Sequence, residues 1–259
     1  MSLLAASHLV LQRGGRTVVD GVSASIRPGC VTAILGPNGA GKTSLLLALA
    51  GLLKPQSGQV ALDAMPISGL SMRERGRRIG YLAQAPDVHW DLTVEALVTL
   101  GRHPHRGSFA GLSAADKAAV ARALEAADVA KFAGRPVKTL SGGERARVLM
   151  ARLVAGEPEV ILADEPLANL DLAHQADSLA LFRALADGGA AVALVLHDLS
   201  VASRVADHVL LMQDGRVAAE GAPAEVLVPA RLAVVYGVHI DVLVGPDGGR
   251  LLVPGARVR

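Results

Sequence analysis

The sequence is poor in aromatic residues and has a single cysteine. Only 2% of its 259 residues are Phe, Trp or Tyr, and Trp90 is the one tryptophan. A lone cysteine, Cys30, excludes a disulfide bond within the chain and is typical of proteins from a reducing compartment. Because Cys30 opens an apolar stretch, we interpret it as a small core residue.

Long hydrophobic runs are also missing. The longest uninterrupted ones, residues 45–50 and 190–196, are far shorter than the roughly 20 apolar residues that a membrane-spanning helix needs. Residues 1–15 lack a basic segment, and Ser7 and His8 interrupt their apolar stretch, so we expect no signal peptide. Any role at a membrane is therefore expected to be peripheral.

The chain also lacks a large excess of charge of either sign. Lys and Arg number 26 and Asp and Glu number 24, which gives a net charge of +2. This balance gives no support for nucleic acid as a partner. Arginines do gather locally over residues 73–78, and we interpret them as a solvated helix face rather than a phosphate-binding patch.

What the chain does have is material for a large core. Hydrophobic residues make up 51% and charged residues 19%, which predicts either one large α/β domain or a core with a smaller subdomain. Residues 1–30 alternate polar and apolar side chains around Gly14-Gly15 and Asp20-Gly21. This pattern predicts short antiparallel strands with turns at both places.

The rest of the chain divides into strand-and-helix segments and a helix-rich insertion. Short apolar runs predict strands of a parallel sheet buried on both faces, at residues 31–35, 160–163 and 190–196. Helix formers dominate residues 91–156, although the text between residues 85 and 112 is rich in turn residues. The expected division is a catalytic core of residues 1–84 and 158–225, a helical subdomain of residues 85–157 and a C-terminal extension of residues 226–259.

The most specific single motif follows the strand at residues 31–35. It has the spacing G-x-x-x-x-G-K-[ST] and leads into a helix of leucines and alanines. Glycines let backbone N–H groups turn inward around an anion, and the helix N-terminus adds its positive dipole end. Lys42 can then reach the β- and γ-phosphates of a nucleotide, and the Thr43 hydroxyl can bind Mg²⁺. The predicted nucleotide-binding residues are Gly36, Pro37, Asn38, Gly39, Ala40, Gly41, Lys42, Thr43 and Ser44.

Two carboxylates directly follow the apolar run at residues 160–163. In an open α/β sheet, ligands bind at the carboxyl ends of the strands, so Asp164 and Glu165 are expected beside the phosphate loop. Asp164 would bind Mg²⁺, and Glu165 would polarise an attacking water. Taken alone, the pair has a solvated acidic turn as its alternative interpretation.

With these motifs the chain resembles, over essentially its whole length, the nucleotide-binding subunit of an ATP-binding-cassette (ABC) transporter. The string Leu140-Ser141-Gly142-Gly143-Glu144 matches the family's signature, with Glu144 in place of the usual final Gln. The resemblance implies that Ser141, Gly142, Gly143 and Glu144 act in trans, on the γ-phosphate bound by a second copy in a head-to-tail dimer. Without the other motifs, these residues read as a serine N-cap before a flexible glycine pair.

Three further positions match the family. Gln84 matches its glutamine loop, residues 168–171 match its D-loop with Ala168 and Asn169 departing from the common residues, and His197 matches its switch histidine. The resemblance implies ATP and Mg²⁺ as cofactors, with Glu165, His197 and Lys42 as catalytic residues and Thr43, Gln84 and Asp164 serving Mg²⁺. It also implies an α/β P-loop NTPase core with a mostly parallel sheet covered by helices on both faces, an N-terminal antiparallel β subdomain and an inserted helical subdomain.

One departure from the family concerns the nucleotide base. The family usually stacks an aromatic residue on adenine before the phosphate loop, and residues 8–19 hold none. The guanidinium plane of Arg13 can stack on a base instead. A surface turn residue is the alternative interpretation of Arg13.

Residues 92–106, which follow the glutamine loop, are similar to the branch of the family that powers uptake of iron–siderophores, haem and cobalamin. We therefore expect an importer of a metal chelate, with hemin or a ferric siderophore as first candidates and cobalamin as another. Trp90 and residues 92–106 are expected to grip a helix of the membrane subunit, with core packing as the alternative for Trp90. His103 and His105 are not expected to bind a metal, because the transported chelate should not touch this subunit.

The same resemblance sets the expected partners. Two copies would dock on two transmembrane permease subunits at the cytoplasmic face of a bacterial inner membrane, with a periplasmic substrate-binding protein as an indirect partner and no nucleic acid. An exporter motor shares every catalytic residue and stays an alternative. So does a non-transport cassette that acts on nucleic acid or ribosomes, although the chain has neither a second cassette nor a long coiled-coil insertion.

Overall fold

A four-stranded antiparallel sheet forms at the N-terminus. The structure, a computed structural model, describes residues 3–84, 91–107, 111–245 and 249–258. The strand order of this sheet is β2-β1-β4-β5, formed by β1 (Leu4–Arg13), β2 (Arg16–Ile26), β4 (Ser57–Leu62) and β5 (Met65–Pro66). The turn predicted at Gly14-Gly15 joins β1 to β2 and is confirmed.

The turn predicted at Asp20-Gly21 is wrong. Both residues lie inside β2, which pairs with β1 on either side of them. The register steps from Leu9↔Val22 to Leu11↔Val19, so β2 carries an extra residue there. A β-bulge uses the positive φ of Gly21 (67°) to accentuate the twist without ending the strand.

A six-stranded sheet forms the centre of the molecule. Its order is β10-β9-β3-β8-β7-β6, and every neighbouring pair is parallel except β9 and β10. The strands are β3 (Val31–Leu35), β6 (Ile79–Leu82), β7 (Val160–Asp164), β8 (Ala191–Val195), β9 (His208–Gln213) and β10 (Arg216–Gly221). All residues of β3, β7 and β8 are buried, as the continuous apolar runs predict.

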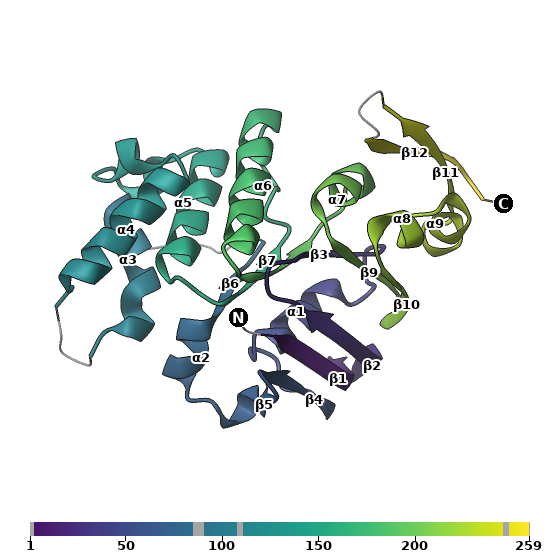
Figure 1. The fold of residues 1–259 in the computed structure, drawn as a ribbon, viewed down its shortest axis with the longest axis horizontal. Coiled ribbons are helices and arrows are strands. Elements are labelled where there is room, and N and C mark those ends of the chain that lie inside the picture. Colours follow the sequence, from purple (N-terminus) through teal and green to yellow (C-terminus); the bar gives the residue numbers. More distant parts are fainter. Residues whose placement is uncertain (1–2, 85–90, 108–110, 246–248, 259) are drawn as a thin grey trace.

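The two faces of the central sheet belong to different hydrophobic clusters. Ile34 packs with α1 (Lys42–Leu49) and the antiparallel sheet, whereas its neighbours Ala33 and Leu35 face the opposite cluster. That second cluster includes Phe182 and Ala186 of α6 (Leu172–Asp187) and residues of α7 (Leu199–Val205). Helices therefore cover both faces (Figure 1), and the predicted fold class is confirmed.

Helices α3 (Val94–Thr99), α4 (Ala114–Ala126) and α5 (Gly142–Ala155) pack against one another beside the sheet (Figure 1). A 3-10 helix, η2 (Leu100–His105), continues α3. A serine followed three residues later by an acidic residue is typical of a helix start, and Ser113 and Asp116 form a reciprocal capping box at the start of α4. The division of the chain at residues 85 and 157 stays a prediction.

The arginines of α2 (Met72–Arg78) do more than form a solvated face. The Nε groups of Arg73 and Arg77 both donate to the Pro104 carbonyl oxygen of η2, at 2.9 and 2.8 Å. Arg78 forms ion pairs with Asp63 and with Glu159, the latter at 2.8 Å. The interpretation of this cluster as merely solvated is therefore incomplete: the side chains tie α2 to neighbouring segments.

The C-terminal segment adds two short helices and a hairpin, namely α8 (Pro223–Val226), α9 (Pro229–Tyr236), β11 (Val238–Val244) and β12 (Arg250–Arg257). Leu252 of β12 is buried, and its N–H donates to the Ser200 hydroxyl of α7 at 2.9 Å. The sequence Asp247-Gly248-Gly249 is typical of a turn between two strands, but it falls largely on residues 246–248, outside the described residues. Within the described part of the chain, we find no helix both long and apolar enough to cross a membrane.

Substituting Phe182 tests the packing between α6 and the sheet. Phe182 is 1% exposed, so Phe182→Ala should lower the free energy of unfolding by about 3–5 kcal/mol through lost burial and a residual cavity. Leu172→Ala, on the same helix but 85% exposed, should change it by less than about 0.5 kcal/mol. Urea unfolding measures both; equal effects would contradict this packing.

Candidate functional site

Four of the parallel strands lead into predicted site residues at one edge of the central sheet. The glycine loop follows β3, Gln84 follows β6, Asp164 ends β7 with Glu165 directly after it, and His197 follows β8. Because β3, β8, β7 and β6 are consecutive neighbours, their carboxyl ends lie side by side. The structure thus brings together the predicted phosphate loop, Gln84, both carboxylates and His197.

Glycine is required at both ends of the phosphate loop. A Cβ built on Gly36 would lie 2.2 Å from the carbonyl oxygen of Met212 in β9. A Cβ built on Gly41 would lie 2.4 Å from the carbonyl oxygen of Val18, and Gly41 has φ +96°. The loop is therefore held tightly between β9 and β2, in a conformation that side chains rarely allow.

The helix that follows this loop has no side-chain cap. Gly41 is the N-cap of α1 and supplies no capping side chain, and no acidic residue lies in the first turn. The N-terminal amide groups of α1 thus point toward the loop with the positive end of the helix dipole. Such an end suits an anion, and Lys42, Thr43 and Ser44 are the residues that present it.

Lys42 closes the loop from inside. Its Nζ donates to the carbonyl oxygens of Gly36 at 2.7 Å and Pro37 at 3.0 Å, and the residue is only 6% exposed. Burial lowers the pKa of Lys42, while the charges of Glu165 and Asp164 oppose that shift. The lysine is thus a buried cation among the loop and two carboxylates.

Asp164 is a buried carboxylate with an unused oxygen. It is 2% exposed, and Oδ1 has no hydrogen-bond partner among the described residues. Burial raises its pKa, while a hydrogen bond to the Thr43 side chain opposes the rise. A buried carboxylate oxygen beside a hydroxyl matches the oxygen donors that Mg²⁺ prefers, so Asp164 and Thr43 fit the predicted magnesium site.

Glu165 is held by two side chains from neighbouring strand ends. Gln84 Nε2 donates to Glu165 Oε2 at 2.5 Å, and His197 Nε2 lies 2.5 Å from Glu165 Oε1. Glu165 has φ +50°, a left-handed conformation that aims its side chain away from the strand direction. Glu165 and His197 line a cavity of about 220 Å³ together with Ala168 and Gln175.

The signature residues lie at the start of another helix. Ser141 is the N-cap of α5: its Oγ accepts from the Glu144 N–H at 3.2 Å, and Glu144 Oε2 accepts from the Ser141 N–H at 2.8 Å. The interpretation of Ser141 as a serine N-cap is therefore confirmed within this chain. Gly142 and Gly143 adjoin Asn169 of the same chain.

Arg13 ends β1 at the tip of the hairpin beside the exposed turn Gly14-Gly15. Burial and the charge of Asp164 raise the pKa of Tyr81 to about 12, and the positive charge of Arg13 opposes this rise. Arg13 therefore lies on the side of the molecule that carries the site, and its contact with a base stays a prediction.

The motifs gave no signal for Tyr236 of α9. Burial raises the pKa of Tyr236 to about 12, and a hydrogen bond to the Gly36 backbone opposes the rise. The C-terminal segment thus reaches the first glycine of the phosphate loop. Backbone groups have no side-chain signature, so a contact of this kind cannot be found from motif spacing.

The expected membrane-subunit surface is only partly described. Trp90 lies outside the described residues. Within residues 92–106, His105 Nε2 contacts the Gly156 carbonyl oxygen at 2.9 Å, and Arg102 is buried against Asp116. These contacts fix η2 against α4 and α5.

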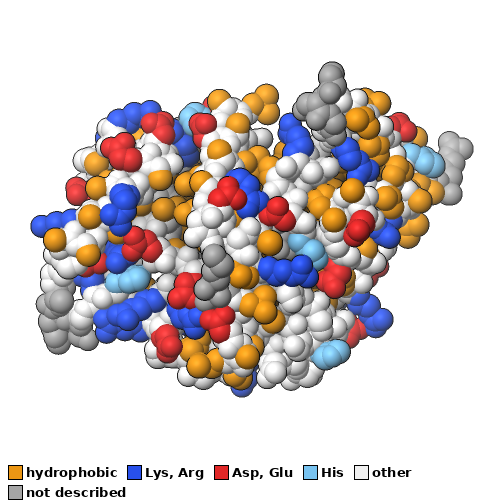
Figure 2. All heavy atoms as spheres, viewed as in Figure 1, with side chains coloured by type: hydrophobic (Ala, Val, Ile, Leu, Met, Phe, Trp, Pro, Cys, Tyr) orange, Lys and Arg blue, Asp and Glu red, His pale blue; other side chains and the backbone are white. Residues whose placement is uncertain are grey.

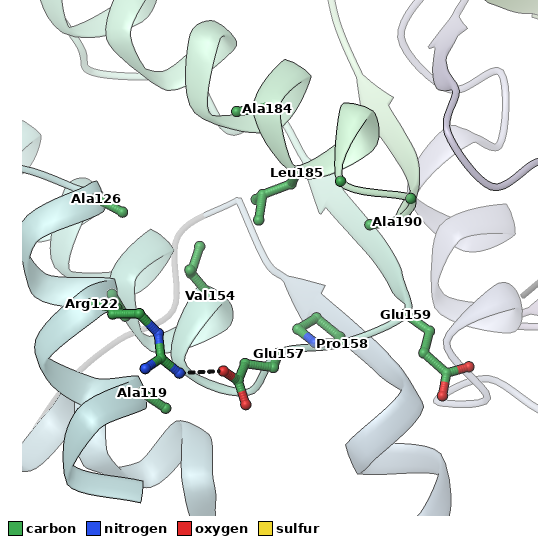
Figure 3. A pocket seen from close by; sticks show the side chains of 13 residues that line it. Ala119, Arg122, Ala126, Val154, Glu157, Pro158, Glu159, Ala184, Leu185 and Ala190 are labelled. Atoms are coloured by element: carbon green, nitrogen blue, oxygen red, sulfur yellow. Dashed lines mark hydrogen bonds and ion pairs between the residues drawn. The ribbon is translucent and has the colours of Figure 1, made fainter. Parts of the chain in front are cut away.

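Another cavity lies away from these residues. A hollow of about 570 Å³ lies between α4, the end of α5 and the end of α6 (Figure 3). Small apolar residues line much of it, and the Arg122–Glu157 ion pair at 2.8 Å lies at one side. None of the predicted site residues contributes to this cavity, so it is separate from the phosphate loop and the carboxylates.

The chain is similar to several known proteins. The family model described as ABC transporter matches residues 19–168. The hemin import ATP-binding protein HmuV of Streptomyces coelicolor is 45% identical over 251 residues, 97% of this chain and 89% of the relative. A solved structure described as an inward-facing metal-chelate type ABC transporter has a TM-score of 0.84 at 25% identity, covering 98% of each chain. A dimeric bacterial ABC transporter cassette has a TM-score of 0.76 at 27% identity, covering 85% of this chain and 98% of the other.

Opposite pKa shifts at two aspartates predict opposite effects of removing their charge. The folded state disfavours ionised Asp164, because its pKa is raised, but favours ionised Asp171, whose pKa the His174 N–H lowers. Near pH 7, Asp164→Asn should therefore raise the melting temperature of the nucleotide-free chain, and Asp171→Asn should lower it. The Asp164 effect should fade as the pH falls through its folded pKa toward about 3.9. Thermal unfolding decides; a lower melting temperature for both variants would contradict the assignment.

Proposed function

This chain belongs to the ABC transporter family, and from that premise we propose that it hydrolyses ATP to drive an importer of a metal chelate, with hemin as the first candidate. ATPase activity is supported above all by one observation. At the ends of adjacent parallel strands, four side chains lie close together: Lys42, Asp164, Glu165 and His197. Hemin follows from the likeness to a hemin import ATP-binding protein over nearly the full length of both chains.

Binding of the nucleotide would rest on the phosphate loop. The uncapped N-terminus of α1 and the buried ammonium of Lys42 both favour the phosphates, and the glycines let the backbone approach them closely. Bound ATP would replace the two loop carbonyl groups as a partner of Lys42. Gly36 and Gly41 are fixed by β9 and β2, so the cradle is largely formed before ATP arrives.

Hydrolysis would rest on Glu165. Asp164 and Thr43 would hold Mg²⁺, which supplies charge neutralisation between the phosphate oxygens when bound. Glu165 would accept the proton of the attacking water, because each of its carboxylate oxygens keeps a lone pair beyond the bonds from Gln84 and His197. Those two donors would hold the carboxylate in one orientation, and His197 would contact the γ-phosphate.

As the ATP-binding subunit of an importer, the chain would associate with transmembrane permease subunits. We place the chain as a peripheral subunit at the cytoplasmic face of a bacterial inner membrane, served indirectly by a periplasmic substrate-binding protein. Acidic and basic side chains are interspersed over the face shown in Figure 2, which does not favour nucleic acid as a partner.

The second copy would complete the ATP site. Ser141, Gly142 and Gly143 form a second helix N-terminus suited to an anion, and this helix adjoins the chain's own D-loop. A head-to-tail dimer would bring the signature of one copy to the γ-phosphate of the other. A dimeric cassette of similar fold supports such an assembly.

Glu165→Gln tests the hydrolytic role. The variant should bind ATP with nearly unchanged affinity but lower kcat by about 10²–10⁴-fold, because the amide cannot accept the proton. Glu74→Gln, an exposed change in the first turn of α2, should leave kcat unchanged. Phosphate release measures both. Undiminished hydrolysis by Glu165→Gln would overturn the assignment.

The same variant tests the transported compound in cells. In a strain that lacks this chain, the parent gene should restore growth on hemin as the iron source, and the Glu165→Gln gene should not. Parallel cultures with a ferric siderophore or with cobalamin dependence separate the candidates. Restored growth on a siderophore alone would keep the ATPase and replace hemin as the substrate.

Ser141→Ala tests the trans site against a matched control. Ser113 and Ser141 both cap a helix through a capping box, so Ser113→Ala and Ser141→Ala should each lose about 1 kcal/mol of stability. In the Glu165→Gln background, only Ser141→Ala should weaken the ATP-dependent dimer, by about tenfold, through one lost hydrogen bond to the phosphate. Sedimentation velocity measures the dimer. Equal dimerisation by both variants would argue against signature binding in trans.

A further inference from the structure

The loop between β7 and α6 carries unusual backbone strain. Glu165, directly after β7, has φ +50°, and Asn169 has φ +64°. Non-glycine residues rarely adopt this left-handed conformation, which costs about 1–2 kcal/mol each. A short loop with two such residues needs fixed partners to stay in one conformation.

Gln175 of α6 supplies those partners from the first turn after the loop. Its Nε2 donates to the carbonyl oxygens of Leu170 at 3.1 Å and Leu167 at 3.4 Å. The Leu167 oxygen also accepts the Leu170 N–H at 3.3 Å. The side-chain amide therefore ties both ends of the 167–170 turn to the helix.

The clamped turn faces two functional groups at once. On one side Gln175 lines the 220 Å³ cavity together with Glu165 and His197. On the other side, a Cβ built on Gly143 would lie 3.4 Å from the Asn169 carbonyl oxygen. The turn thus lies between the carboxylate of its own chain and the glycines at the start of α5.

We propose that Gln175 is a positioning residue for ATP hydrolysis, which holds the 165–171 loop so that Glu165 stays aligned with the nucleotide. This role rests on the proposed ATPase function. Gln175 does not take part in proton transfer; it acts through the two carbonyl groups and through the short backbone path from Leu167 to Glu165.

Glutamine is suited to this task because one NH₂ group carries two donors. Methionine has a similar length and no donor, so Gln175→Met leaves the Leu167 and Leu170 carbonyl groups without their side-chain partner. Gln175→Glu has the same shape, but its carboxylate can only accept hydrogen bonds, as do the Leu167 and Leu170 carbonyl oxygens that it would face. Gln175→Asn keeps the amide and shortens the side chain by one carbon.

The experiment measures ATP hydrolysis and ATP binding by the full chain. Gln175→Met should lower kcat about ten- to a hundredfold, because a small displacement of Glu165 spoils its alignment. The dissociation constant for ATP should change by less than about twofold, since Lys42 and the glycine loop are untouched. Gln175→Glu should lose at least as much activity, and Gln175→Asn should lie between Gln175→Met and the parent.

Ser178→Ala is the matched control on the same helix. Ser178 is 3% exposed, and its Oγ donates to the His174 carbonyl oxygen at 2.7 Å without touching the 165–171 loop. This variant should lower the melting temperature but leave kcat within twofold of the parent. It separates loss of a buried hydrogen bond in α6 from loss of loop positioning.

Three results would overturn the role of Gln175: kcat of Gln175→Met within twofold of the parent, a fall in kcat matched by an equal fall in ATP affinity, or the same fall in Ser178→Ala. If Gln175→Met does not fold, the order of Gln175→Asn above Gln175→Glu in kcat supports the role and equality refutes it. The proposed function fails separately, when the parent chain does not hydrolyse ATP or Glu165→Gln hydrolyses it undiminished.

Discussion

Parallel pairing of β3, β8, β7 and β6 is the constraint on which the rest of the site depends. A parallel pair sends both chains out at the same edge, so four segments far apart in the sequence deliver their next residues to one crevice. Lys42, Gln84, Glu165 and His197 meet for this reason and not through local structure. The continuous burial of β3, β7 and β8 stabilises these strands in the middle of the sheet, because both faces of the sheet are packed against side chains.

The site concentrates features that oppose folding. Asp164 is buried and its Oδ1 finds no partner within the described part of the chain, Lys42 is buried beside it, and Glu165 occupies a left-handed conformation. The surrounding packing over-determines each of them, since β7 and β3 are fully buried strands of the same sheet. A ligand that neutralises Asp164 and engages Lys42 would relieve these penalties only in the folded state, so binding and stability are coupled here.

The parts of the site that sequence reasoning could predict are those with a local signature. The spacing from Gly36 to Thr43, the carboxylates after β7 and the serine cap at Ser141 each belong to one short segment, and their order along the chain identifies the family. Asp20-Gly21 misled because a turn and a β-bulge share the same residues, and only the continued pairing of β2 with β1 distinguishes them. The contacts of Arg73 and Arg77 with the Pro104 carbonyl were missed because a backbone acceptor has no residue type.

Sequence reasoning missed Gln175 and Tyr236 for the same reason. Both side chains connect the ends of sheet strands to neighbouring segments. Gln175 binds the carbonyl groups of the loop after β7, and Tyr236 bonds to the Gly36 backbone at the end of β3. The first links the carboxylate to the glycines of α5, and the second links the phosphate loop to the C-terminal segment. A shift of α5 relative to the sheet must therefore displace the Asn169 turn or open a gap against it, because Gly142 and Gly143 leave no side chain between them. The helical lobe and the catalytic carboxylate are thus connected through backbone packing, within a single chain, before any second copy binds.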